Sequence, residues 1–272
     1  MSQARINPDG PLKGRVALVT GASRGIGEAI CARLAMEGAS VVASARTASD
    51  GESRLPGTLA DTVERIKAAG GKAAFVKADL AQAIERERLV EEAEATFGPI
   101  DILINNAAIT YFIPVEEFPE KRFKLMMEVQ VYAPFHLSQL VLPGMKARKS
   151  GWIVNISSPA GLHPKQPYGR GRGGTVYGMC KAALERFTTG LASEVYDDGI
   201  AVNVVSPGLV DTPGVAVHGL INEQSKDRVQ PIEYIAEAVY RLASGDPKTM
   251  TGRIDYAEPF LKELAVQPSA LV

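Results

Sequence analysis

Thr20-Gly21-Ala22-Ser23-Arg24-Gly25-Ile26-Gly27 is a glycine-rich turn that lies between the apolar run Val16–Val19 and an amphipathic stretch from Ile26 to Glu37. A strand, a glycine turn and a helix in this order are typical of phosphate-binding sites. Glycines let the backbone approach the anion, and the helix N-terminus presents free N–H groups. The glycine spacing, G-x-x-x-G-x-G, differs from the common G-x-G-x-x-G, so the turn alone is a weak signal. A Tyr-x-x-x-Lys pattern far downstream, at Tyr177 and Lys181, strengthens it.

The length and composition limit the class of protein. The chain has 272 residues, of which 46% are hydrophobic, which suffices for one large α/β domain or two small ones. A formal net charge of −1 provides no general attraction to nucleic acid or to an anionic membrane, so neither is expected as a partner. Two cysteines, Cys31 and Cys180, do not make a disulfide framework and favour a reduced compartment.

The N-terminal residues 1–14 are polar and lack the apolar core of a signal peptide. No apolar run approaches the length of a membrane span. We therefore expect a cytoplasmic protein in which a flexible leader, residues 1–14, precedes a single domain, residues 15–272. The histidines His136, His163 and His218 show no metal-ligand spacing, and no metal site is expected.

Strand-like apolar runs alternate with helical patterns along most of the chain. The expected strands are Arg15–Thr20, Ser40–Ala45, Ala73–Lys77, Ile100–Ile104, Gly151–Ser157, Ile200–Ser206 and Gly252–Tyr256. The expected helices are Gly25–Glu37, Thr58–Ala69, Gln82–Phe97, Glu120–Ala147, Val176–Tyr196 and Ile232–Ala243. Several of these strands are apolar on both faces, which suits the interior of a parallel sheet. The alternation predicts repeated βαβ units and hence an α/β fold, a doubly wound parallel sheet flanked by helices on both faces.

The second expected strand ends without a carboxylate. In dinucleotide-binding sheets an acid at this position accepts hydrogen bonds from the ribose 2′-hydroxyl of NAD and would repel a 2′-phosphate. This chain has Arg46 there instead, and Arg24 in the glycine turn could converge with it on a phosphate, with Ser44 as a hydroxyl donor. We therefore expect NADP(H) as the cofactor. The alternative is that both arginines are solvated surface residues.

Tyr177 and Lys181 are four residues apart, so they share one face of a helix. A free tyrosine has a pKa of about 10 and is a poor acid or base at neutral pH. A neighbouring ammonium favours the phenolate, and we expect it to lower the pKa of Tyr177. The polar run Asn155–Ser158 closes the preceding strand, at the end where open α/β sheets bind ligands. One of its serines could hydrogen-bond a carbonyl oxygen as it becomes an alkoxide.

In this order and context the motifs resemble those of the short-chain dehydrogenase/reductase family. The matching segments extend over almost all of residues 15–212 and are Thr20–Gly27, Asn105–Ala107, Ile153–Ser158, Tyr177–Lys181 and Val202–Gly208. The resemblance implies a single Rossmann domain, usually assembled as a homotetramer or homodimer. It implies Tyr177 as the proton donor or acceptor and Ser158 as the residue that orients the substrate oxygen. Lys181 would hold the nicotinamide ribose and tune the tyrosine.

The resemblance also assigns positions around the cofactor. It implies that Asp79 lies at the adenine and Asn105 under the cofactor ribose. Pro207, Gly208 and Thr212 would frame the nicotinamide. The full set of expected cofactor-binding residues is Gly21, Ser23, Arg24, Gly25, Ile26, Gly27, Ser44, Arg46, Asp79, Leu80, Asn105, Ala107, Tyr177, Lys181, Pro207, Gly208, Val210 and Thr212.

The chain departs from the family pattern near the catalytic residues. Gln130, which we count with the catalytic group, stands where the family usually has an asparagine that supports a proton-relay water beside the lysine. The longer glutamine either holds the relay differently or displaces the water. We expect retuned activity, and Gln130→Asn should raise turnover if the relay limits it. Ala108 replaces a glycine of the family pattern, and its methyl group restricts that turn.

Two loops and the C-terminus also stand out. The interval between Ser158 and Tyr177 is longer than is usual in the family and contains Arg170 and Arg172. These arginines would either attract an anionic substrate or form a solvated or subunit-contact loop, and the second interpretation is favoured. The loop Thr47–Gly57 is also long, and is either functional or a tolerated surface insertion. The chain lacks the family's Asp-Gly-Gly after the last strand, so the packing of its C-terminus is not predicted.

Together these features predict reversible hydride transfer between NADP(H) and a carbonyl/secondary-alcohol pair, with Tyr177 as the general acid/base. The apolar segments Ile109–Pro114 and Val215–Leu220 favour a hydrophobic small-molecule substrate. One alternative is a non-catalytic NADP(H)-binding sensor or scaffold on the same fold. The presence of Ser158, Tyr177 and Lys181 speaks against it. A second alternative is an NADP-dependent dehydratase or epimerase.

Overall fold

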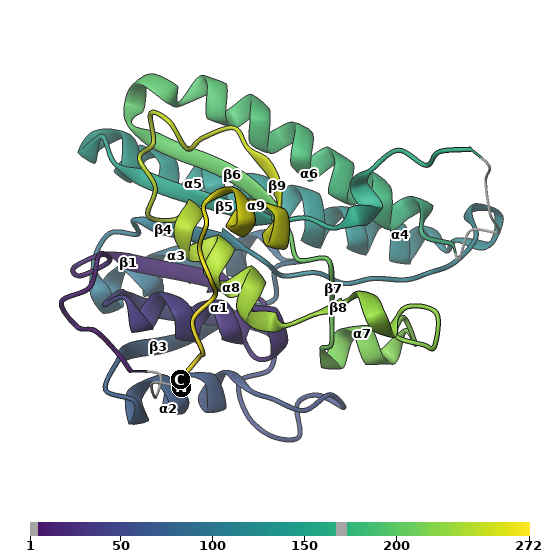
Figure 1. Cartoon of the computed structure of the whole chain (residues 1–272), viewed down its shortest axis with the longest axis horizontal. Coiled ribbons are helices and arrows are strands. Elements are labelled where there is room, and N and C mark those ends of the chain that lie inside the picture. The colour runs from purple at the N-terminus through teal and green to yellow at the C-terminus, as the bar shows by residue number, and fades with distance from the viewer. Residues whose placement is uncertain (1–4, 167–172) are drawn as a thin grey trace.

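The computed structural model describes residues 5–166 and 173–272 and is built around one central sheet. Seven strands run parallel in the order β3-β2-β1-β4-β5-β6-β9 (Figure 1). Their bounds are β1 Val16–Thr20, β2 Ser40–Ala45, β3 Lys72–Lys77, β4 Ile102–Asn105, β5 Gly151–Ile156, β6 Ile200–Ser206 and β9 Ile254–Tyr256. The chain adds β2 and β3 on one side of β1 and then returns to add β4, β5 and β6 on the other side. The order therefore reverses between β1 and β4.

Helices cover both faces of the sheet. One face packs against α1 (Gly25–Met36), α2 (Leu59–Ala68), α8 (Ile232–Leu242) and α9 (Ala257–Glu263). The other face packs against α3 (Ala83–Phe97), α5 (Ala133–Arg148) and α6 (Thr175–Glu194). Parallel strands need crossover helices, and consistently right-handed crossovers place the helices of the two halves on opposite faces. The predicted doubly wound, Rossmann-type α/β fold is thus confirmed.

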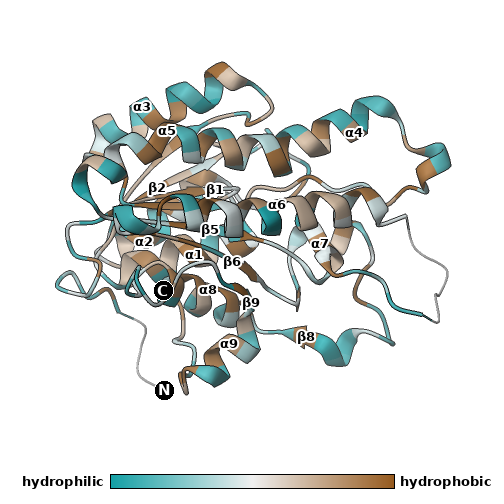
Figure 2. Cartoon of the chain, turned by 90° about the horizontal axis from the view of Figure 1, so that it is seen from above, coloured by the Kyte–Doolittle hydropathy of each residue, from teal (hydrophilic) through white to brown (hydrophobic). Residues whose placement is uncertain are grey.

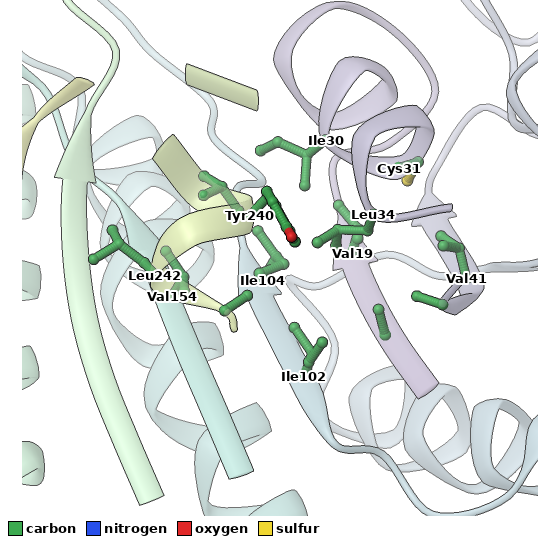
Figure 3. Packing of buried hydrophobic residues seen from close by; sticks show 14 of the residues in the cluster. Val19, Ile30, Cys31, Leu34, Val41, Ile102, Ile104, Val154, Tyr240 and Leu242 are labelled. Carbon is green, nitrogen blue, oxygen red and sulfur yellow. The ribbon is translucent and has the colours of Figure 1, made fainter. Parts of the chain in front are cut away.

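The core lies on both sides of the apolar strands. Val19 and Ile104 pack with Ile30 and Leu34 of α1 and with Tyr240 of α8 (Figure 3). Neighbouring residues in β1 alternate, so Val16 and Leu18 belong to the cluster on the opposite face. In Figure 2 the central strands are accordingly mainly brown, the hydrophobic colour. A strand buried on both faces holds the glycine turn that follows it in a fixed place.

The long helix expected over residues 120–147 is divided in the structure. Helix α4 (Glu120–Met127) and helix α5 are joined by a π-helical turn, Glu128–Tyr132. Within this turn the N–H of Ala133 donates to the carbonyl oxygen of Glu128, five residues earlier. Pro134 explains the change, because it has no N–H to donate to Gln130 in a regular α-helix. The wider turn contains Gln130, one of the expected catalytic residues.

Short elements at the carboxyl end of the sheet were not predicted. A separate two-stranded sheet pairs β7 (Leu209–Val210) with β8 (Val229–Gln230). Between these strands lies α7 (Pro213–Val217), whose first turn is capped by the Thr212 hydroxyl, which accepts from the N–H of Val215 at 3.2 Å. Two-residue strands are too short to give a periodic signal. They nevertheless fix both ends of the segment 211–228, which contains α7.

Part of the expected N-terminal leader is packed on the domain. The N–H of Asn7 donates to the carbonyl oxygen of Met36 (2.8 Å), and the N–H of Leu12 donates to that of Glu37 (2.9 Å). Leu12 is fully buried in the core. Burial of this one leucine gives residues 7–12 a defined place at the end of α1. Across residues 5–166 and 173–272, we find no helix with the length and apolarity needed to span a membrane.

Candidate active site

A cleft opens at the carboxyl ends of the strands, where the order reverses between β1 and β4. Doubly wound sheets bind their ligands at this point. The cleft has a volume of about 330 Å³. The expected site residues that line it are Gly21, Ser23, Arg24, Gly25, Ile26, Gly27, Arg46, Asp79, Leu80, Ala107, Tyr177, Lys181, Pro207 and Thr212. The glycine turn and the Tyr-x-x-x-Lys pattern, far apart in sequence, therefore face one cleft.

The glycine turn is closely packed. A Cβ atom on Gly21, whose φ is +66°, would lie 2.8 Å from the Cα of Ala107. A Cβ atom on Gly27 would lie 2.2 Å from the carbonyl oxygen of Gly21. Asn106 holds the turn, because its Nδ2 donates to the carbonyl oxygens of Thr20 (2.9 Å) and Gly21 (3.1 Å). Helix α1 has no side-chain cap at its N-terminus, so its first N–H groups are available to an anion.

Arg24 and Arg46 lie close together at one end of the cleft. Burial lowers the pKa of Arg24, and the charge of Arg46 lowers it further. An anion between two such cations would relieve their repulsion. The Arg24 guanidinium also has a structural role, because its Nε donates to the Pro56 carbonyl (2.8 Å) and an Nη to the Gly57 carbonyl (2.8 Å). Arg24 thus fixes the end of the loop 47–57, whose residue Leu55 lines the cleft.

Ser44 does not line the cleft. Its side chain is buried within β2, and its Oγ has no hydrogen-bond partner. Side chains alternate along a strand, so Ser44 shares the face of Val42, which packs in the cluster under α3 and α5. This placement does not support the expected contact of Ser44 with a phosphate. Asp79 and Leu80, which follow β3, do line the cleft, as expected.

The three expected reacting side chains come together. Tyr177 and Lys181 lie one turn apart on α6, and the hydroxyl of Ser158, which follows β5, lies near the phenol of Tyr177. The Nζ of Lys181 donates to the carbonyl oxygen of Ile156 (2.9 Å) and lies 5.6 Å from the centre of the Tyr177 ring. Ser157, the neighbour of Ser158, instead donates to Glu185 (2.6 Å). The hydroxyl of Ser157 is thus engaged by Glu185, which leaves that of Ser158 as the one that acts on the phenol of Tyr177.

The expected lowering of the Tyr177 pKa by Lys181 is not found. Burial raises the pKa of the Tyr177 phenol, and the nearby hydroxyl of Ser158 opposes this increase. Burial also lowers the pKa of Lys181 to about 8, against the charges of Cys180 and Glu185. Removal of both groups from water thus disfavours both the phenolate and the ammonium. In this arrangement Tyr177 is protonated at neutral pH.

Gln130 is buried, and its side chain is hydrogen-bonded to the segment after β4 and not to Lys181. Its Nε2 donates to the carbonyl oxygen of Ile109 (2.8 Å), and its Oε1 is buried without a partner. Ile109 lines the cleft beyond β4, next to Ala108. Gln130 therefore anchors the segment that follows β4 to the π-helical turn.

Asn105, Gly208 and Val210 lie just outside the cleft lining. The Nδ2 of Asn105 donates to Asn155 Oδ1 (2.9 Å), and the Oδ1 of Asn105 is buried without a partner. Gly208 has a φ of +75° and lies against Gln230. Val210 is buried in β7. These residues support the cleft from behind.

Aromatic residues form a wall beside Tyr177. The ring of Phe112 lies 5.9 Å from that of Tyr177, at 72°, and 5.0 Å from that of His218, at 86°. Both contacts are edge-to-face, the arrangement that aromatic pairs prefer. His218 follows α7, and burial lowers its pKa, which keeps it neutral at physiological pH. The wall thus connects the segment after β4 with the segment between β7 and β8.

Arg170 and Arg172 lie outside the described residues. Within the described part, no three His, Cys, Asp or Glu side chains are grouped so that they could hold a metal ion.

The sequence matches known proteins over most of its length. Residues 15–219 match the short chain dehydrogenase family. The chain belongs to the short-chain dehydrogenase/reductase family. An oxidoreductase of Thermotoga maritima is 39% identical over 256 residues, which cover 89% of this chain and 95% of the relative.

Solved structures of this family share the fold of the chain. A metagenomic short-chain oxidoreductase in complex with NADP superposes with a TM-score of 0.72 at 29% identity, covering 96% of this chain and 100% of the other. A 3-oxoacyl (acyl-carrier-protein) reductase of Agrobacterium tumefaciens with NADP bound gives a TM-score of 0.78 at 31% identity, covering 94% and 97%. This short-chain dehydrogenase/reductase is thus an oxidoreductase that acts on a small molecule.

Several residues that line or support the cleft of this short-chain dehydrogenase/reductase were not predicted as site residues. They are Ala45, Thr47, Leu55, Ala78, Asn106, Ala108, Ile109, Val129, Ile156, Ser157, Pro213 and Gly214. Asn106 could have been found, because an amide directly after a buried strand has no place in the core. Leu55 and Val129 could not, because loop 47–57 and the π-helical turn bring them to the cleft.

Proposed function

We propose that this protein catalyses NADP(H)-dependent interconversion of a carbonyl compound and a secondary alcohol. The observation that carries the proposal is that Tyr177 and Lys181 line the same cleft as the glycine turn. The hydroxyl of Ser158 lies near the tyrosine at this point. A proton donor, a cation and an anion-binding turn are thus available within one site.

The residues present fit a phosphorylated dinucleotide. Bound NADPH would supply the hydride. The uncapped N-terminus of α1 and the glycine turn would hold its pyrophosphate, since a side chain at Gly21 or Gly27 would clash with backbone. Arg46, with the remaining donor of Arg24, would bind the 2′-phosphate, and the mutual repulsion of the two cations supports this assignment. Lys181 would hold the nicotinamide ribose.

Tyr177 would transfer the proton. Burial holds the phenol in its protonated form, so it is ready to donate to a carbonyl oxygen that gains negative charge. Ser158 would hydrogen-bond the same oxygen and orient it. Gln130 would hold the substrate side of the cleft through Ile109. We therefore propose Ser158, Tyr177 and Lys181 as the catalytic residues and Gln130 as a residue that supports them.

The substrate would be an apolar small molecule. Phe112 and His218 form the wall beside Tyr177, and Ile109 and Tyr111 pack against a buried apolar cluster. A neutral histidine adds no charge to this wall. Such a surface favours a hydrophobic carbonyl compound over a charged one.

We also propose that the protein works as a homodimer or homotetramer in the cytoplasm. The exposed aromatic residues Phe123, Tyr132 and Phe135 lie together on α4, the π-helical turn and α5, and would be covered in an oligomer. Light scattering measures the assembly. Two buried free cysteines, Cys31 and Cys180, suit a reducing compartment.

The experiment is a spectrophotometric assay of NADPH oxidation against ketones and aldehydes of graded size and polarity. We expect turnover with apolar ketones and a lower kcat/KM with NADH. If no compound causes NADPH oxidation although NADPH binds tightly, the result would support a sensor or scaffold function instead. Product analysis by mass spectrometry separates reduction from dehydration or epimerisation.

A further inference from the structure

Helix α6 contacts the end of β5 at two consecutive residues. The Nζ of Lys181 donates to the carbonyl oxygen of Ile156 (2.9 Å). One turn further along the helix, Glu185 accepts a hydrogen bond from the hydroxyl of Ser157 (2.6 Å). Ser158 is the next residue of the chain. The two contacts therefore fix the backbone on which the hydroxyl of Ser158 is carried.

Glu185 also packs against the turn that contains Ser158. In this turn the N–H of Gly161 donates to the carbonyl oxygen of Ser158 (2.9 Å), and the N–H of Ala160 donates to Ser158 Oγ (3.3 Å). A Cβ atom on Gly161 would lie only 2.8 Å from Glu185 Oε1, so the carboxylate lies directly behind the turn. A hydrogen bond to an ionised acceptor is stronger than one between neutral groups. Glu185 is thus placed to hold both ends of the segment 157–161.

We propose that Glu185 is a positioning residue that acts through Ser157 to hold the hydroxyl of Ser158 against Tyr177. The inference rests on the proposed carbonyl/alcohol chemistry. Ser157, which takes no part in the proton transfer, then has a role as the link between α6 and the reacting serine. Small displacements of a positioned group are costly, because catalysis depends on alignment.

The charge of Glu185 acts on Lys181 as well. Burial lowers the pKa of Lys181, and the charges of Cys180 and Glu185 oppose this decrease. On the sheet side, burial and the charge of Glu185 both raise the pKa of Tyr256 in β9. The negative charge of Glu185 thus favours the protonated form of the buried Lys181.

The test compares Glu185→Ala, Glu185→Gln and Ser157→Ala, with Glu194→Ala, an exposed glutamate on the last turn of the same helix, as the control. We expect Glu185→Ala and Ser157→Ala to lower kcat roughly 10- to 100-fold, with little change in the Kd for NADPH. Glu185→Gln keeps an acceptor for Ser157 and should retain most of kcat. It should also shift the basic limb of the pH–rate profile to lower pH, because Lys181 loses a supporting charge. Glu194→Ala should match the wild type.

Crystal structures of the wild type and Glu185→Ala separate this inference from the proposed function. The inference predicts that Ser158 moves away from Tyr177 in the variant, whether or not a substrate has been found. An unchanged distance between the hydroxyls of Ser158 and Tyr177 would overturn it. If the wild type is active, an unchanged kcat in Glu185→Ala would also overturn it. So would a similar loss of kcat in Glu185→Ala, Glu185→Gln and Ser157→Ala that is accompanied by a lower Tm in each of them. Lack of activity in the wild type, with Ser158 displaced in the variant, would contradict the proposed function and leave the positioning role supported.

Discussion

Lys181 and Tyr177 line one cleft, yet the ammonium of Lys181 donates to the carbonyl oxygen of Ile156 and lies 5.6 Å from the centre of the Tyr177 ring. Burial of both groups favours their neutral forms. A protonated phenol is the form that a proton donor needs in carbonyl reduction. A phenol that is protonated at neutral pH agrees with the proposed role of Tyr177 as the proton donor.

The stability of Lys181→Met relative to the wild type should depend on pH. The ordinary pKa of lysine is 10.5, and burial lowers that of Lys181 to about 8. Between these values the unfolded chain binds a proton that the folded protein does not, so wild-type stability rises with pH across this window. Below about pH 8 the cost of burying the ammonium is fully present. Urea denaturation from pH 7 to 10 measures the free energy of unfolding of both proteins. The value for the wild type minus that for Lys181→Met should increase with pH. A difference that does not change with pH would contradict the burial of a titrating lysine.

Arg46→Asp should change the preference between coenzymes. We expect kcat/KM for NADPH to fall about 100-fold, because a carboxylate repels the 2′-phosphate. The value for NADH should rise, since the new carboxylate can accept hydrogen bonds from the ribose hydroxyls. Arg54→Asp, an exposed arginine in the neighbouring loop, is the charge-matched control and should leave the preference unchanged. Equal effects of the two variants would point to general electrostatics instead of a phosphate site.

Phe112→Ala should alter substrate selection and leave coenzyme binding intact. The ring contacts Tyr177 and His218, and Phe112 is not part of the cofactor cleft. For bulky apolar ketones we expect a loss of roughly tenfold in kcat/KM, with a smaller loss for small ketones. The control is Phe75→Ala, an exposed phenylalanine on β3. A uniform loss across all substrates would argue against a specificity role.

The buried ion pair between α1 and α8 should be costly to break on one side. Arg33 Nε lies 2.6 Å from Glu237 Oε2, both side chains are almost fully buried, and the Arg33 guanidinium covers the Tyr240 ring. Arg33→Met leaves the buried carboxylate with Arg241, a partly exposed residue, as its remaining ion-pair partner, and should lower the free energy of unfolding by about 3 kcal/mol. The double variant Arg33→Met/Glu237→Leu should recover most of this loss. Urea denaturation measures both, and a double variant no more stable than Arg33→Met would show that the pair itself is needed.

Much of the fold could be predicted from the sequence because its signals are local. The strands Ser40–Ala45 and Ile200–Ser206 have the predicted bounds, since both are buried runs that end at sharp changes of composition. The division of the helix at Glu128–Tyr132 was missed, although Pro134 carried a signal for it. The β7–β8 pair could not be predicted, because two-residue strands depend on contacts between distant segments.

The parts of the candidate site that a short sequence motif determines could be predicted from the sequence. The glycine turn and the spacing of Tyr177 and Lys181 placed these residues on one cleft. Contacts that depend on packing were not predictable. The bonds of Arg24 to the loop at Gly57 and the burial of Ser44 follow from tertiary structure. The pKa of Tyr177 was expected to fall and instead rises, because sequence spacing gives proximity but not desolvation.

The most direct test of the account is the rate of NADPH-dependent ketone reduction by Tyr177→Phe. Phenylalanine keeps the ring and its contact with Phe112 but removes the only atom proposed to deliver the proton. We predict a kcat about 10²- to 10⁴-fold lower, with an unchanged Kd for NADPH. A variant that reduces ketones at the wild-type rate would contradict the central claim.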